Sequence, residues 1–524
     1  MARRGILALL VPALLLAAAC ATAGRPAVAP APPGIDWAAR LAEAAALGAA
    51  GHYAALREAL GIYREAAAES VGGTEVVEKL VRTSIAFELR KRELGVLSDG
   101  PAPDLGALVA AEPSLARYGP WLELLSGLPA KVKGNPGIER IGGRTLDAHL
   151  DWVAARVPDL DRGLGLSAPG DELAATLRLA LRAAFPFKFE DQLEGRAVRE
   201  LHPGSRLVAF QSAMFPAYDF ETLDALLAAE PGFAEIDYFL GEAALLGGKL
   251  LTAERRYLAV HSRIPASLSV LVSLAKVAFQ VEELESCLEW NEKALAVLPT
   301  YRDALLGKGL ALGYLGRNDE ALAALGRLLE LGTYYMGEGH FWTAWNLNEL
   351  GRLEEARRAV EAAAVFLVDI GDVHTLSGII AYRQGRLDDA EKALRRALDL
   401  NASESDAAYY LGRLYADRGD WLSSGIYFAG AALSLEEKER GLEAKIGEIE
   451  ASEMPAERRA RLAARKRAQA ESVRATKATC QYNGAAGYHN AGSFDRALDL
   501  ARLAAGHPAF AGKAAELVRK IQER

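Results

Sequence analysis

Residues 385–398 read Gly-Arg-Leu-Asp-Asp-Ala-Glu-Lys-Ala-Leu-Arg-Arg-Ala-Leu, and this stretch decides the fold of the chain. A glycine followed by a charged residue is typical of a short turn, and most of the residues after it are strong helix formers. Small residues stand five positions after the glycine, at Ala390, and seven positions further, at Ala397. Because small side chains let two helices approach closely, the stretch predicts the second helix of an antiparallel helical hairpin.

The same turn recurs along the chain. Glycine followed by Lys, Arg or Asp begins turns at residues 248, 316, 351, 385 and 419, which are separated by 68, 35, 34 and 34 residues. The first separation is twice 34, and its midpoint falls at Glu282, where the pattern continues without the glycine. Five residues after each turn stands a small residue: Ala253, Cys287, Ala321, Ala356, Ala390 and Ser424. A period of about 34 residues over six units predicts a stack of hairpins.

Further glycines, Gly241, Gly309, Gly378 and Gly412, stand seven residues before turns, and the whole arrangement resembles the tetratricopeptide repeat. The resemblance covers roughly residues 233–434, with a further unit at 480–508, and we assign residues 201–434 to the array. It implies an all-α fold, a right-handed solenoid of antiparallel helix hairpins.

The remaining segments are also expected to be helical. Residues 36–200 carry apolar positions at helical spacing without clean repeats, so they are either degenerate hairpins or a separate helical domain, with Pro/Gly-rich loops at 100–136 and 157–170. Residues 435–479 interrupt the period, and the break Ser452-Glu453-Met454-Pro455 predicts a projecting pair of long helices. Residues 480–524 are then a final repeat and a helix that caps the terminal apolar face.

The first residues carry a targeting pattern. Arg3-Arg4, the apolar run 6–16 and three alanines precede Cys20, and this arrangement resembles a bacterial lipoprotein signal peptide. The resemblance implies removal of residues 1–19 and a lipid on Cys20. The Pro/Ala-rich composition of the following residues predicts an extended tether over residues 20–35. Ordinary secretory cleavage and an uncleaved anchor are the alternatives. The expected location is the bacterial cell envelope, on the outer membrane facing the periplasm.

The residues that could bind a partner follow from the resemblance, in which the first helix of each hairpin forms the inner face. Aromatic and basic side chains on a concave surface are typical of peptide recognition. The alternative for each is a core position between hairpins. The expected partner-binding residues are Tyr238, Lys276, Phe279, Tyr314, Phe341, Trp345, Tyr382, Tyr409 and Arg413.

Composition and motifs favour a scaffold over an enzyme. The net charge of −8 argues against a nucleic-acid binder, which needs a basic surface. The sequence contains no His-Glu-x-x-His, Gly-x-Ser-x-Gly or phosphate-binding glycine loop, so no cofactor, metal or catalytic residue is expected. A disulfide between Cys287 and Cys480 stays open. The expected function is a protein-protein interaction scaffold that binds a segment of an envelope or secretion component; the alternative is an envelope enzyme with a site in residues 36–200.

The densest positive charge lies close to the predicted break between the two long helices, at Arg458, Arg459, Arg461, Arg465, Lys466 and Arg467. A solvated helix face explains such a cluster, and the alternatives are contact with anionic lipid or with an acidic partner.

Overall fold

The structure, a computed structural model, describes residues 35–97, 105–127, 140–141, 144–167, 170–184, 195–214, 217–332 and 335–523. Cys20 and the predicted signal peptide lie outside these residues. The chain divides into two compact units, one ending at Phe239 and one beginning at Leu240. The boundary lies inside one helix, and residues 201–239, which the sequence analysis assigned to the array, belong to the N-terminal unit.

Within the described residues, the regular structure of the N-terminal unit is helical except for one antiparallel pair of two-residue strands, β1 Arg140–Ile141 and β2 Arg144–Thr145. Its helices are α2 Trp37–Ala50, α3 Tyr53–Ala68, α4 Gly73–Leu94, α5 Leu105–Ala111, the 3₁₀ helix η1 Pro113–Tyr118, α6 Gly119–Gly127, α7 Leu146–Ser167, α8 Glu172–Ala184, α9 Gly195–Leu201, α10 Arg206–Ala213, α11 Phe220–Ala229 and the first part of α12 Ala234–Leu246.

Both loops predicted in this unit contain helix. Helices α5, η1 and α6 lie within residues 100–136, and α7 continues through Pro158 as far as Ser167. The loop prediction for 157–170 was therefore wrong over most of its length. Val157 and Leu164 are buried seven residues apart, so an apolar stripe on α7 offsets the helix-breaking tendency of the exposed proline.

A buried arginine links several helices of the N-terminal unit. Arg90 on α4 is completely buried, and its Nε donates to the carbonyl oxygen of Gly51 at 3.0 Å. Its Nη1 donates to Glu93 at 2.6 Å, and the guanidinium carbon lies 4.2 Å from the ring centroid of Phe210 on α10. These contacts hold the turn between α2 and α3, together with α10, against α4.

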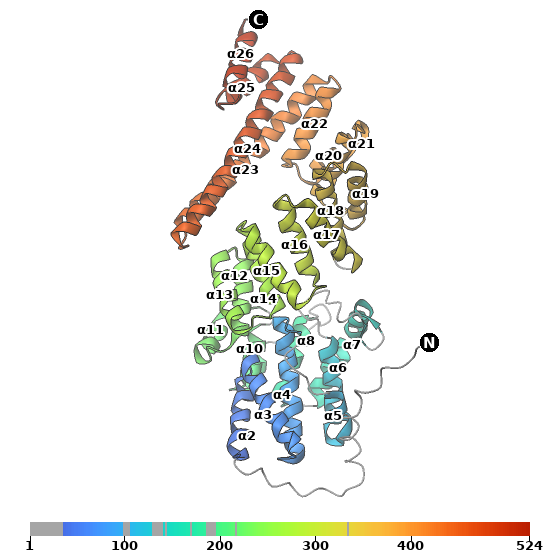
Figure 1. The fold of residues 1–524 in the computed structure, drawn as a ribbon, viewed down its shortest axis with the longest axis vertical. Helices are drawn as coiled ribbons and strands as arrows, with labels where there is room; N and C mark the ends of the chain where they lie inside the picture. Colours follow the sequence, from blue (N-terminus) through green and yellow to red (C-terminus); the bar gives the residue numbers. More distant parts are fainter. Residues whose placement is uncertain are drawn as a thin grey trace, which may run out of the picture. The chain divides into compact units, whose positions relative to one another are not determined.

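The C-terminal unit is a stack of helical hairpins, which forms the solenoid expected from the repeats (Figure 1). After α12 its helices are α13 Leu250–Arg263, α14 Leu268–Gln280, α15 Leu284–Val297, α16 Arg302–Tyr314, α17 Asn318–Glu330, α18 Met336–Glu349, α19 Leu353–Phe366, α20 Gly371–Arg383, α21 Leu387–Leu400, α22 Ser405–Asp417, α23 Trp421–Ala451, α24 Ala456–Asn490, α25 Phe494–Ala505 and α26 Ala511–Gln522.

The repeated glycines allow the two helices of a hairpin to cross closely. A Cβ atom placed on Gly378 of α20 would lie 2.5 Å from Cγ of Leu394 on α21, a distance that atoms in contact do not reach. Gly309 faces Leu325 and Gly412 faces Phe428 in the same way. The repeated glycine is therefore a packing requirement, and it places the first and second helices of each hairpin in a fixed register.

Helices α23 and α24 are longer than the other helices of the stack. Helix α23 spans 31 residues and α24 spans 35, and both continue beyond the ordinary hairpin as far as the break at residues 452–455. They pack along each other as one long hairpin (Figure 1). At the end of the chain, Ile521 of α26 packs with Tyr488 and Ala497, so α26 covers the last hairpin.

Candidate binding groove

The first helices of successive hairpins form one continuous face. Helices α14, α16, α18, α20 and α22 contact one another in succession, while each second helix packs against the first helix of the next hairpin. Eight of the nine residues expected to bind a partner lie on these five helices, one or two on each of them. We call this face the groove.

The first part of the groove carries a connected group of aromatic rings. The Phe279 ring lies 5.5 Å from that of Tyr314, which lies 5.6 Å from Trp342 and 5.8 Å from Trp345. Phe341 extends the group through Trp342, at 5.3 Å. Tyr314 is 52% exposed, so the group presents aromatic surface while its other members also contact the hairpin cores.

A cavity of about 260 Å³ opens beside this group, between α14 and α16. Its lining is mainly apolar, with Val272, Ala275, Phe279, Leu306 and Leu310 among its residues. The expected binding residue Lys276 also lines it and is exposed. A volume of this size accommodates one large apolar side chain.

One buried polar side chain lies in the wall of this cavity. Asn291 of α15 is 1% exposed and lines the cavity; its Nδ2 donates to the carbonyl oxygen of Cys287 at 2.8 Å, while its Oδ1 accepts no hydrogen bond from the described residues. Gly307 makes room for it, because a Cβ there would lie 2.6 Å from that oxygen. This oxygen is covered and not open to the cavity, which therefore presents a mainly apolar surface.

The second part of the groove carries tyrosines and an arginine. The Tyr382 ring lies 5.5 Å from Tyr410, and Tyr409 lies 5.5 Å from Tyr410. The Arg413 guanidinium lies 5.1 Å from the Tyr382 centroid. Tyr382 donates to Asp417 at 2.6 Å, and burial together with this hydrogen bond raises the pKa of Tyr382 to about 12. Its hydroxyl is therefore protonated at neutral pH.

The structure separates the nine expected residues into two groups. Lys276, Phe279, Tyr314, Phe341, Trp345, Tyr382, Tyr409 and Arg413 are at least partly exposed. Tyr238 is 3% exposed and belongs to the N-terminal unit, where its ring packs 5.2 Å from that of Phe239. Its aromatic surface is used in the core, so we leave it out of the groove.

Sequence reasoning missed three residues of this surface. Trp342 and Tyr410 stand beside expected residues, and aromatic pairs at adjacent positions of a first helix were the available signal. Asn291 lies on a second helix, and nothing in the repeat pattern marked it.

The N-terminal unit, the expected place for an alternative enzymatic site, brings His52 near Glu230, with 3.6 Å between Nε2 and Oε1. The other ring nitrogen, Nδ1, accepts from the backbone of Ala55 and caps α3. Burial is the largest effect on His52 and lowers its pKa, while the nearby Glu230 acts in the opposite direction. A neutral, helix-capping histidine has a structural role, and the arrangement does not form a recognisable catalytic set.

Other features bear on the sequence expectations. Cys287 and Cys480 are free and buried, so the disulfide left open above is not formed. Within the described residues, no cluster of three or more His, Cys, Asp or Glu side chains is placed to hold a metal ion. No helix in that part of the chain is long and apolar enough to cross a membrane.

Comparison with known proteins gives partial matches. No curated protein matches this chain. Among solved structures, residues 41 to the end of MamA from Desulfovibrio magneticus RS-1 are 17% identical, with 33% of this chain and 96% of that chain covered and a TM-score of 0.30. PilW, a widely conserved type IV pilus biogenesis factor, is 15% identical, with 37% and 90% covered and a TM-score of 0.36. A tetratricopeptide repeat protein from Parabacteroides merdae is 14% identical, with 55% and 98% covered and a TM-score of 0.35.

These TM-scores are too low to support an inference about function. Family comparison is more direct, because residues 306–370 and 375–436 match the tetratricopeptide repeat family. The matched segments contain α17, α18, α19, α21, α22 and most of α20, which include the helices of the second part of the groove. These two segments are tetratricopeptide repeats, and the described residues of the C-terminal unit form an all-helical stack of hairpins.

Proposed function

We propose that the groove of the C-terminal unit binds a segment of a partner protein and that the chain acts as an interaction scaffold without chemistry of its own. The observation that carries the proposal is the cavity between α14 and α16, which is mainly apolar and lies beside the exposed ring of Tyr314. Tetratricopeptide repeats bind protein or peptide partners, which agrees with this use of the face.

The geometry defines what the partner segment presents. One large apolar side chain fills the cavity of about 260 Å³. Aromatic side chains meet this requirement. Burying one such ring removes ~150–250 Å² from water, so this single anchor supplies a large share of the affinity. The rings around Tyr314 then cover the residues that flank the anchor.

We also propose that the chain works in the bacterial envelope, held at the membrane by a lipid on Cys20 and bound to an envelope or secretion component. The support is the sequence pattern of residues 3–20, with basic, apolar and small residues in order before the cysteine. Metabolic labelling with an alkyne fatty acid tests it: the native chain takes up label, and a Cys20→Ser variant does not. Equal labelling of the variant would refute lipidation at this residue.

The groove is tested by photo-crosslinking in cells that produce the chain. Benzoyl-phenylalanine is placed at Tyr314 in the groove or at Phe366, a residue of similar exposure (55%) on α19, a second helix. Discrete adducts are expected from position 314 and not from 366. The same adducts are expected to disappear when Lys276→Glu and Phe279→Ala are added, because these changes alter the cavity.

Folding of the variants is checked by far-ultraviolet circular dichroism. Adducts that are equal from both positions, or that persist after the cavity changes, would place recognition elsewhere on the chain.

A further inference from the structure

The basic cluster near the break between α23 and α24 is paired within the chain. Arg458 donates through Nη1 to Glu254 of α13 at 2.7 Å and through Nη2 to Glu283 at 2.6 Å. Its Nε also donates to Glu283, at 3.0 Å. Arg461 contacts the same carboxylate at 2.6 Å. Burial alone would raise the pKa of Glu283, but these two arginines outweigh it and lower that pKa.

A second set of contacts lies about two turns further along α24. Lys466, which is 8% exposed, donates to Glu282 at 2.6 Å, and Gln469 donates to the other oxygen of that carboxylate at 2.6 Å. The long hairpin therefore starts beside α22 and ends on the turn between α14 and α15. We call α23 and α24 the strap, and Glu254, Glu282 and Glu283 the acidic anchor.

The turn that receives the strap is unlike the others in the array. Glu282 has φ +61°, the left-handed backbone conformation that glycine adopts at residues 248, 316, 351, 385 and 419 of the equivalent turns. Holding a residue with a side chain in this conformation costs about 1 kcal/mol. Among these turns, the one that carries a strained glutamate is the turn that Lys466 and Gln469 contact. This strain is an independent sign that the anchor has a role.

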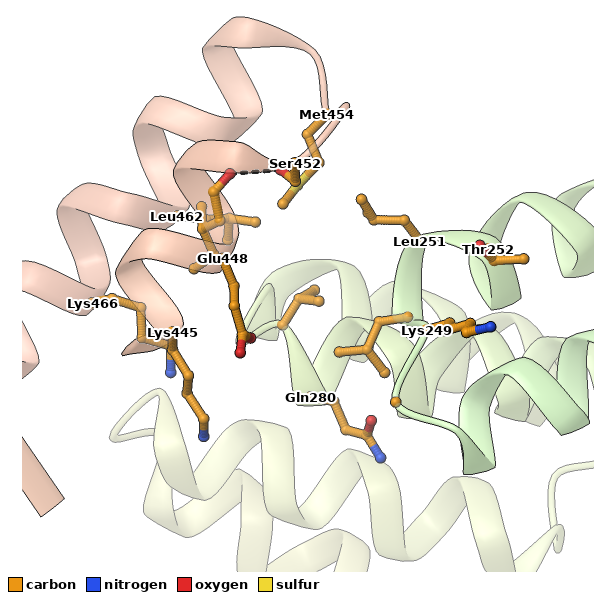
Figure 2. Close-up of a pocket in the computed structure, with 14 residues that line it drawn as sticks. Lys249, Leu251, Thr252, Gln280, Lys445, Glu448, Ser452, Met454, Leu462 and Lys466 are labelled. Carbon is orange, nitrogen blue, oxygen red and sulfur yellow. Dashed lines mark hydrogen bonds between the residues drawn. The ribbon is translucent and has the colours of Figure 1, made fainter. Parts of the chain in front are cut away.

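The strap touches the array without filling the space beneath it. A cavity of about 660 Å³ lies between them, with Leu251 and Val281 on the array side and Met454 and Leu462 on the strap side (Figure 2). Figure 2 also shows Lys445 and Glu448 pointing into this space. A close-packed interface leaves few voids larger than a water molecule, so this contact is held mainly by its ion pairs.

The strap cavity is adjacent to the groove. Gln280, the last residue of α14, lines both the cavity under the strap and the cavity proposed to hold the partner's anchor side chain. The strap therefore docks at the end of the groove where the partner is expected to insert. Movement of the strap alters the surroundings of that end.

We propose that the strap is a releasable closure of the array, whose basic tip occupies the acidic anchor and which opens when those ion pairs are exchanged or screened. In the closed state, helices α15 to α22 and the strap form a ring that limits access to the groove near Gln280. Release opens this end. The effect on partner binding rests on the groove function proposed above, whereas the opening itself does not.

Opening is measured by double electron–electron resonance on the full chain carrying Cys20→Ser. Spin labels are placed on cysteines introduced at Arg255 of α13 and Ala460 of α24, both exposed, while Cys287 and Cys480 are buried. At low ionic strength, one narrow distribution of distances is expected. Salt at ~1 M shortens the screening length to ~3 Å and is expected to add a broad, longer component.

Charge variants distinguish the ion pairs of the acidic anchor from a general effect of net charge on the strap. Glu282→Lys is expected to lower the ratio of closed to open chains about tenfold, and adding Lys466→Glu is expected to restore it. Glu282→Gly removes the carboxylate and relieves the backbone strain, so it opens the strap without weakening the turn. Glu437→Lys on the exposed part of the strap makes the same change in charge away from the anchor and is expected to have no effect.

Two results would overturn the proposal. A narrow distribution that survives both Glu282→Lys and ~1 M salt would show a fixed interface. A broad distribution for the native chain at low salt would show that the strap is not docked. Neither measurement contains a partner, so failure of the strap proposal is distinguishable from failure of the groove proposal, which is judged by crosslinking at position 314.

Discussion

Replacing Gly378 by alanine is expected to destabilise the hairpin of α20 and α21, although the same replacement usually stabilises a helix. The new Cβ would lie 2.5 Å from Cγ and 2.7 Å from Cδ2 of Leu394, and 3.3 Å from the carbonyl oxygen of Ala390. Leu394 is completely buried and cannot move aside without disturbing its neighbours. Such overpacking costs about 1–3 kcal/mol.

The opposing effect is the helix propensity of alanine, which exceeds that of glycine by about 1 kcal/mol. The net expectation for Gly378→Ala is a loss of about 1 kcal/mol, within a range of about 0–2 kcal/mol. Gly326, inside α17, is the matched control, because no atom lies within 4 Å of a Cβ placed there. Gly326→Ala is expected to stabilise its hairpin by up to about 1 kcal/mol, the opposite sign from the same chemical change.

Hydrogen exchange followed by mass spectrometry is the suitable assay, because repeats in an array can open separately and a single global free energy is poorly defined. Protection of the α20 and α21 amides gives the local free energy of opening. Combining Gly378→Ala with Leu394→Ala provides the cross-check, since shortening the leucine removes the Cγ and Cδ2 atoms that lie closest to the new methyl group. Unchanged or increased protection in Gly378→Ala would refute the packing argument for the repeated glycine.

Further predictions concern buried ionisable groups. Glu235 is completely buried, and burial, the largest effect, raises its pKa to about 7 despite the opposing charge of Arg90. The native state therefore holds a proton that the unfolded chain releases above the ordinary value of 4.5, and stability falls as pH rises from about 4.5 to 7, by up to about 3 kcal/mol. Chemical denaturation of Glu235→Gln is expected to remove this slope, and the exposed Glu58→Gln is expected to leave it; an unchanged slope in Glu235→Gln would contradict the assignment. Burial also raises the pKa of Cys287 and Cys480 to about 12 from 9.0, so at pH 8 both thiols are expected to react with iodoacetamide about a thousandfold more slowly than a free thiol and to become reactive on unfolding. Rapid native labelling would show that the hairpins open readily.

The repeat architecture was predictable because it depends on local rules. Glycine at the turns and small residues at helix crossings recur at fixed offsets, and the structure places helices α14 to α22 where this spacing requires. The α7 segment was mispredicted because Pro158 suggested a loop, while the deciding factor was burial of Val157 and Leu164 against other helices. Packing between different helices is not visible in the sequence pattern of one short segment.

The groove was predictable by position but not in detail. Assigning first helices to one face selected residues such as Tyr314 and Trp345, because that assignment follows from the repeat. The burial of Tyr238 and the cavity beside Asn291 depend on which side chains meet across different helices. The basic cluster of α24 was interpreted as a solvated face, and its pairing with Glu283 joins residues 175 positions apart, which no short pattern reveals.

The ion pairs of the strap also bear on the order in which the chain acquires its structure. Hairpins of the array contact their neighbours and form from residues close in sequence, which favours rapid, stepwise folding from the N-terminal side during synthesis. Arg458 meets Glu254 across 204 positions, so this pair forms only after the array between them exists. Newly made chains therefore pass through a period in which Glu254, Glu282 and Glu283 are without their basic partners. A basic segment present at that time would meet this carboxylate surface before the chain's own strap does.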